Sequence, residues 1–171
     1  FDSWEAADGA QVRSADTGNL LLDLAVVERL GLRFDPRYGL TGGEDSLFTR
    51  QLTRAGGVIR FAAGAVVTKR VPAARARRTW VLERSLRSGS SWARVRIDTA
   101  GPADGGASGR LARLRLRLGY GAKGLAKAGI DGARAGVARI RGDVPAQARY
   151  EVSSRGGLGM VVGALGVHVR E

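Results

Sequence analysis

The chain has 171 residues, 44% of them hydrophobic, which suffices for the core of one domain with an appendage. It holds no cysteine and a single histidine, His168, which excludes disulfides, thiolate nucleophiles and zinc sites built from cysteines or clustered histidines. Any metal chemistry must therefore use carboxylates and a hard cation such as magnesium or manganese.

The net charge of +12 lies entirely in the second part of the chain. Residues 1–70 contain nine basic and nine acidic residues, whereas residues 71–171 contain nineteen basic and seven acidic ones. The second part therefore suits an anionic partner, such as nucleotide phosphates, anionic lipid or nucleic acid. A GC-rich bacterial genome is an alternative cause, because 25 of the 28 basic residues are arginine.

The first elements predicted along the chain are two helices separated by a loop. In residues 19–31, Asp23 fits an N-cap and Gly31 fits a C-terminal stop, so a short helix is expected between them. Residues 32–43 are rich in Gly and turn formers and predict a loop. Residues 44–57 space their apolar side chains for one helix face and end in two glycines, which predicts a second helix.

Strands are predicted next. The β-branched runs at 58–61 and 65–70 are separated by Gly64 and form two strand candidates. A further helix should open at Pro72 and run to about Ser88, before a glycine. Helices and strands that alternate in this way favour an α/β domain.

The composition changes after residue 98. Residues 99–109 are rich in Gly, Ala, Pro and Asp and predict a linker, and residues 110–171 predict a basic, Gly- and Ala-rich helical tail. Residues 156–169 carry no formal charge, but a bilayer-spanning helix needs about twenty residues. Because the chain starts with Phe1 and shows no signal-peptide pattern, we expect it to be a piece of a longer protein.

Two adjacent acids, Glu44 and Asp45, open the second predicted helix. One interpretation is capping: acids at a helix start accept hydrogen bonds from its first amides, and Thr41-x-x-Glu44 matches a capping box. The other is chemistry, with a carboxylate at a rigid tip acting as general base while Gly42 and Gly43 leave room for a substrate. Spacing alone leaves both open.

The helix predicted after Pro72 is strongly basic. Residues 69–87 hold seven basic residues and one acid, and four side chains fall within a sector of about 80° at the α-helical period. This stripe is either a solvated face or a phosphate-binding face in which guanidinium groups grip a pyrophosphate. Its members are Arg77, Trp80, Arg84 and Arg87.

Four motifs occur in fixed order: TGNLLLD at 17–23, FDPRYGLTGGED at 34–45, AGGVIRFAAGAVV at 55–67, and VPAARARRTWVLERSLRSGSSWARV at 71–95. Together they resemble the C-terminal half of a family 2 glycosyltransferase of the succinoglycan-biosynthesis type. The resemblance implies an α/β fold class: residues 1–98 would be the acceptor-side half of a GT-A domain, a Rossmann-like mixed sheet with flanking helices. The mostly helical basic tail would follow it.

The resemblance also implies roles for the residues near the acid pair. Asp45 matches the family's general base on the acceptor hydroxyl, and Glu44 would orient it or contact the acceptor. Gly42, Gly43 and Asn19 would shape the acceptor site. The reaction would be an inverting transfer of sugar from a nucleotide-sugar donor to a saccharide, expected to be lipid-linked, in bacterial surface polysaccharide synthesis.

Donor-diphosphate binding is implied for Arg75, Arg78, Trp80 and Arg84, although Arg75 and Arg78 lie off the basic stripe. The family's Asp-x-Asp is absent from this chain, so a magnesium or manganese ion expected in the full-length enzyme has no ligands here. We therefore expect the chain alone to be incomplete as an enzyme.

The basic tail suggests a cellular location for the protein. It would hold the enzyme to the anionic inner face of the cell membrane, as a cytoplasmic peripheral protein, with pieces such as LARLRLRLGY in the interface. The alternative function is a non-enzymatic module that binds a polyanion, either nucleic acid or an anionic membrane. Nucleic acid is disfavoured, because aromatic residues are few and residues 1–70 are balanced in charge.

Overall fold

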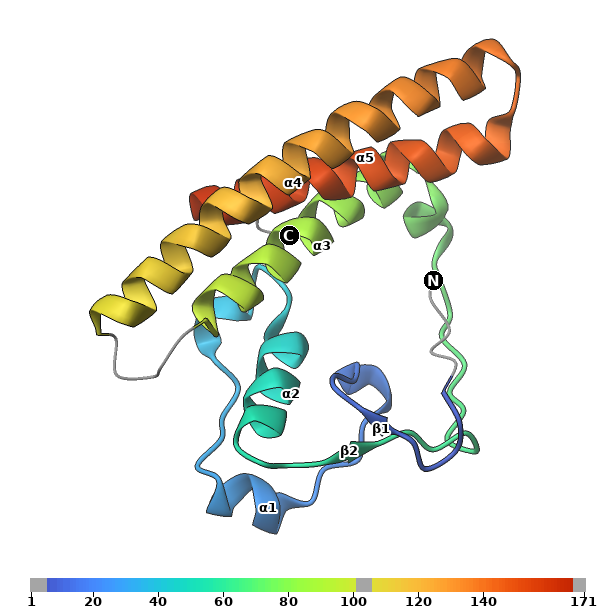
Figure 1. Cartoon of the computed structure of the whole chain (residues 1–171). Helices are drawn as coiled ribbons and strands as arrows, with labels where there is room; N and C mark the ends of the chain where they lie inside the picture. Colours follow the sequence, from blue (N-terminus) through green and yellow to red (C-terminus); the bar gives the residue numbers. More distant parts are fainter. Residues whose placement is uncertain (1–5, 101–105, 168–171) are drawn as a thin grey trace. The chain divides into compact units, whose positions relative to one another are not determined.

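The computed structural model describes residues 6–100 and 106–167, so His168 and residues 101–105 of the predicted linker lie outside the described residues. The chain forms two compact units (Figure 1). The N-terminal unit comprises Phe1–Gly39 and Glu44–Arg70, and the C-terminal unit comprises Leu40–Gly43 and Val71–Glu171.

The predicted α/β, GT-A-like fold class is wrong. Helices hold 66% of the described residues, and the only sheet among them has two short strands. The predicted strand at 65–70 does not form, and Val66 and Val67 are 81% and 58% exposed. A β-branched run becomes a strand only where a neighbouring strand and a buried face receive it, and this run has neither within the described chain.

The N-terminal unit contains a two-stranded antiparallel sheet and two α-helices. Strand β1 (Gln11–Val12) pairs with β2 (Ile59–Arg60), which lies inside the predicted 58–61 run. Helix α1 (Leu24–Arg29) follows the predicted cap, since Asp23 Oδ1 accepts hydrogen bonds from the amides of Ala25 (2.9 Å) and Val26 (3.3 Å). The short-helix prediction is thus confirmed.

Helix α2 (Glu44–Arg54) confirms the second predicted helix. Its apolar face is buried at Leu47, Phe48 and Leu52, which are 3%, 1% and 5% exposed. Phe48 stacks on Phe34 of the same unit with ring centroids 4.4 Å apart. Gly56 follows with φ of +88°, a left-handed conformation that ends the helix at little cost for glycine.

The C-terminal unit is built from three long helices (Figure 1). These are α3 (Arg78–Asp98), α4 (Ala107–Ile140) and α5 (Val144–Leu165), preceded by the 3₁₀ turn η3 (Ala73–Ala76). Helix α5 packs along both α3 and α4, whereas α3 and α4 touch each other little. The helical character predicted for the tail is confirmed, with α5 as its central element.

Glycines bring α5 against its two neighbours. A Cβ at Gly159 would lie 2.9 Å from the Ser90 nitrogen and would overlap the Leu86 carbonyl oxygen of α3. On the α4 side, a Cβ at Gly157 would lie 2.8 Å from both Ala128 N and Gly124 O. Backbone therefore packs on backbone at both contacts, which only residues without a side chain permit.

The predicted helix from Pro72 to Ser88 is misplaced at both ends. The backbone at Arg77 is extended (φ −80°, ψ +141°), so α3 begins one residue later, after η3. It then continues through Gly89 to Asp98. Gly89 does not stop the helix because it is a contact point: a Cβ there would overlap the Gly156 carbonyl oxygen of α5.

Part of the uncharged stretch of the tail packs into the bundle. Five of its residues are buried in α5. None of the helices that the structure describes is both long and apolar enough to cross a bilayer. The buried residues are Gly157, Gly159, Met160, Gly163 and Ala164.

Candidate functional site

The predicted catalytic acids are the first two residues of α2. Gly42 and Gly43 precede them with φ of +71° and +94°, so the chain enters the helix through two left-handed residues that disfavour any side chain. Asp45 Oδ1 accepts a hydrogen bond from the Ser46 amide at 2.6 Å. The Asp45 carboxylate is thus held against the positive end of the helix.

Glu44 has a different environment. Its Oε2 atom is buried and has no hydrogen-bond partner among the residues that the structure describes. The capping box that the Thr41-x-x-Glu44 spacing allows is therefore not completed through this oxygen. A buried acceptor without a donor is costly, and a catalytic role or a bound water or ion can account for such a group.

Residues 40–43 are fixed on α3 within the C-terminal unit. The Ser91 hydroxyl donates to the Thr41 carbonyl oxygen, and Arg94 Nη1 donates to the Thr41 hydroxyl, both at 2.9 Å. A Cβ at Gly43 would lie 3.0 Å from Ser91 Cβ. Position 43 therefore requires glycine for two reasons, its left-handed backbone angle and its close approach to α3.

Asn19 lies in the N-terminal unit, in the 3₁₀ turn η1 (Thr17–Asn19). Its side-chain amide donates a 2.6 Å hydrogen bond to the Ala65 carbonyl oxygen. That bond ties η1 to the segment after β2, which is a structural role. Acceptor binding by Asn19 stays a prediction.

Three of the four predicted donor-binding residues form one cluster. Arg75 Cζ lies 5.7 Å and Arg84 Cζ 5.5 Å from the centroid of the Trp80 ring. The break between η3 and α3 lets Arg75 reach the tryptophan, which a continuous helix from Pro72 would not. Two exposed guanidinium groups on one indole ring form a site able to bind an anion.

Arg78 makes a different contact. Its Nε donates to Glu151 Oε2 of α5 at 2.8 Å, and Gln147 Nε2 donates to the other carboxylate oxygen, also at 2.8 Å. These hydrogen bonds lower the pKa of Glu151 to about 2, and the carboxylate in turn raises the pKa of Arg78. The structure thus separates Arg78 from the Trp80 cluster.

A second polar cluster, which sequence patterns did not predict, joins α4 to α5. Ser153 Oγ donates to Asp131 Oδ2 at 2.6 Å, and Lys127 Nζ lies 3.3 Å from the same oxygen. The Ser153 hydrogen bond is the main cause that lowers the pKa of Asp131. Asp131 is only 8% exposed, so this cluster satisfies a buried charge between two helices.

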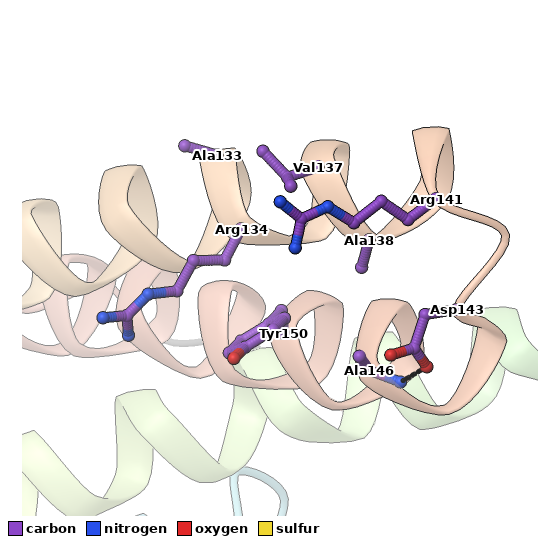
Figure 2. Close-up of a pocket in the computed structure, with 8 residues that line it drawn as sticks. All are labelled: Ala133, Arg134, Val137, Ala138, Arg141, Asp143, Ala146 and Tyr150. Atoms are coloured by element: carbon purple, nitrogen blue, oxygen red, sulfur yellow. Dashed lines mark hydrogen bonds between the residues drawn. The ribbon is translucent and has the colours of Figure 1, made fainter.

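Two shallow pockets lie in the C-terminal unit, and neither gathers the predicted acids. The first, of about 360 Å³, sits between the C-terminal end of α4 and the start of α5 (Figure 2). Its one carboxylate, Asp143, accepts a 3.0 Å hydrogen bond from the Ala146 amide and caps α5. The second, of about 270 Å³, is lined by Arg78, Arg139, Arg155 and Glu151, among others.

The described residues do not supply a metal site. Nowhere in 6–100 and 106–167 do three Asp, Glu or His side chains gather as ligands for an ion. The divalent cation implied by the family resemblance thus finds no matching donor set in this part of the chain.

Part of the chain is similar to a protein of polysaccharide synthesis. Over 90 residues it is 37% identical to the succinoglycan biosynthesis protein ExoM of Rhizobium meliloti (strain 1021), and the match covers 53% of this chain. The matched part is 29% of the length of that relative. No protein-family model and no solved structure matches the chain. The similarity suggests a link to exopolysaccharide biosynthesis.

Proposed function

We propose that the chain is part of an inverting family 2 glycosyltransferase that moves a sugar from a nucleotide-sugar donor to a saccharide acceptor in bacterial surface polysaccharide synthesis. The observation that carries the proposal is the 37% identity to a succinoglycan biosynthesis protein over 90 residues. The acid pair at the start of α2 supports it, because a transfer of this kind needs a positioned base.

Asp45 is the proposed base. The acceptor hydroxyl oxygen forms a bond to the anomeric carbon while the bond from that carbon to the diphosphate breaks and the diphosphate leaves with the electron pair. Asp45 takes the hydroxyl proton. Its hydrogen bond from the Ser46 amide fixes the carboxylate at the helix start, so capping and catalysis are compatible roles for one side chain.

The Trp80 cluster is the proposed contact for the donor diphosphate. Arg75 and Arg84 each place a guanidinium carbon within 6 Å of the centre of the indole ring, so two cations next to Trp80 are available to a diphosphate. In the full-length protein, Arg84→Gln should weaken the binding of a nucleoside diphosphate about tenfold in calorimetric titration, the loss of one charge-assisted contact. Arg149→Gln, an exposed arginine of α5, is the matched control and should bind as the wild type does.

Release of nucleoside diphosphate tests the proposed reaction. The full-length protein is incubated with each of several nucleotide sugars, with and without lipid-linked saccharides extracted from a polysaccharide-producing bacterium. The proposal predicts that release of nucleoside diphosphate from one donor depends on the acceptor fraction. Absence of acceptor-dependent release, together with tight binding to heparin or DNA, would favour the polyanion-binding alternative.

A further inference from the structure

Helix α4 turns an apolar face away from the bundle. Its buried residues, among them Gly124, Ala135 and Ala138, face the other helices of the C-terminal unit. On the opposite side lies a sector of about 100° that runs the length of the helix. Its large members are Leu111, Leu114, Leu118, Leu125 and Ile140, and they form the apolar stripe.

The large side chains of the apolar stripe are exposed to solvent. Leu111, Leu114 and Leu118 are 48%, 53% and 67% exposed, and Leu125 is 60% exposed. Between them the same sector carries Ala122 and small residues further along. Single exposed leucines are ordinary, but a row of them on one helix face marks an interaction surface.

Basic residues flank the N-terminal half of the stripe. Residues 110–125 hold five Lys or Arg and no acid. Four of the five are exposed, and at the α-helical period they lie about 50° to 130° from the centre of the stripe, so their long stems can bring the charges to the edges of the apolar face. These four are Arg110, Arg115, Arg117 and Lys123.

We propose that α4 binds an anionic lipid bilayer, lying flat in the interface with the apolar stripe among the acyl chains and the flanking basic residues on the headgroups. The charge pattern selects this occupant: anionic headgroups suit the flanking basic residues, whereas a second copy of this segment would set basic residues against basic residues, because residues 110–125 hold no acid. α4 would extend over about 50 Å of membrane surface. Binding does not depend on sugar transfer, so the two proposals fail separately.

The first test is vesicle co-sedimentation of the chain. Wild-type protein should partition onto vesicles of phosphatidylcholine with one quarter phosphatidylglycerol at least tenfold more strongly than onto phosphatidylcholine alone, and added salt should reduce this preference. Replacing Leu114, Leu118 and Leu125 together by serine should lower partitioning roughly 30- to 100-fold, because membrane binding of the wild type removes about half of each leucine side chain from water. Circular dichroism should report an intact fold, since all three are surface residues.

A charge control separates the effect of the position of the basic residues on membrane binding from the effect of the net charge of the chain. Arg110, Arg117 and Lys123 changed to glutamine should weaken binding at least tenfold, whereas the same loss of charge at Arg29, Arg33 and Arg70 of the N-terminal unit should leave it nearly unchanged. Equal losses for the two triple variants would overturn the proposal.

Because the chain contains no cysteine, a single introduced cysteine can carry a dye that reports whether its position enters the bilayer. An environment-sensitive dye on Leu118→Cys should shift to the blue when anionic vesicles are added, while the dye on Ala148→Cys, an exposed position of α5, should not. Equal binding to neutral vesicles, or no dye shift at Leu118, contradicts the proposal. A serine variant that dissociates a dimer without changing vesicle binding would show instead that the stripe joins two copies of the chain.

Discussion

Replacing Gly159 by alanine should push α5 away from α3. The added Cβ would stand 2.9 Å from the Ser90 nitrogen and would overlap the Leu86 carbonyl oxygen, whereas ordinary contacts lie at 3.4–4 Å. Both neighbours are backbone atoms of a helix and cannot rotate aside. The two helices must therefore separate by about 1 Å, which loosens the packing along their contact.

The expected cost follows from two opposing terms. Overpacking costs typically about 1–3 kcal/mol, and the rigid backbone neighbours favour the upper end of that range. The better helix propensity of alanine offsets about 1 kcal/mol of this cost. We therefore expect Gly159→Ala to lower the free energy of unfolding by about 2 kcal/mol.

Urea unfolding followed by far-ultraviolet circular dichroism measures this difference. Gly136→Ala in α4 is the matched control, because a Cβ there meets nothing within 4 Å. It should raise stability by about 0.5–1 kcal/mol through propensity alone. Equal stabilisation by both substitutions would refute the backbone-on-backbone contact between α3 and α5.

Two further predictions concern stability. Glu151→Gln should cost about 1–2 kcal/mol at neutral pH, a range reduced for solvent screening because Arg78 is 68% exposed. The pKa of Glu151 is about 2 in the folded protein against 4.5 unperturbed, so its contribution to stability is present above pH 4.5 and is lost as pH falls toward 2. If urea titrations show that Glu151→Gln lowers stability by the same amount at every pH, this prediction is contradicted. Phe48→Ala should cost about 3–5 kcal/mol in the N-terminal unit and abolish hydrogen-exchange protection of α2 while α5 stays protected; retained protection of α2 would count against the stacked Phe34–Phe48 core.

Local signals predicted the helices of the N-terminal unit well. Asp23 caps α1 as its sequence position suggests, and Gly56 ends α2 in a left-handed conformation. The apolar spacing of α2 also matches its buried face. Such features depend on residues within one or two helical turns, which is the range that a sequence pattern reports.

The helix end predicted before Gly89 was wrong because glycine has two structural roles. At Gly56 it ends a helix, but at Gly89 and Gly159 it lets two helices touch. Only the position of the partner helix separates these cases. The α/β fold class was predicted wrongly for a similar reason. Val66 and Val67 form no strand, because the described part of the chain gives them no neighbouring strand to pair with.

For the candidate site, sequence placed the acids at the helix start but not the contacts between distant residues. Arg75 joins Trp80 because the chain breaks at Arg77, a break that periodicity did not indicate. The Arg78–Glu151 ion pair spans 73 positions of sequence, so no local pattern reports it. Its partner on α5 explains why Arg78 stands apart from the Trp80 cluster.

The proposed sugar transfer depends on Asp45 as its base. The most direct measurement is the rate of acceptor-dependent transfer by the full-length protein carrying Asp45→Asn, alongside its affinity for the donor nucleotide. Asp23→Asn is the matched control, because Asp23 is another carboxylate that accepts amide hydrogen bonds at a helix start. We expect Asp45→Asn to reduce transfer at least 100-fold with unchanged donor affinity, and Asp23→Asn to leave transfer intact. Turnover retained by Asp45→Asn would rule out this catalytic role and leave Asp45 as a capping residue.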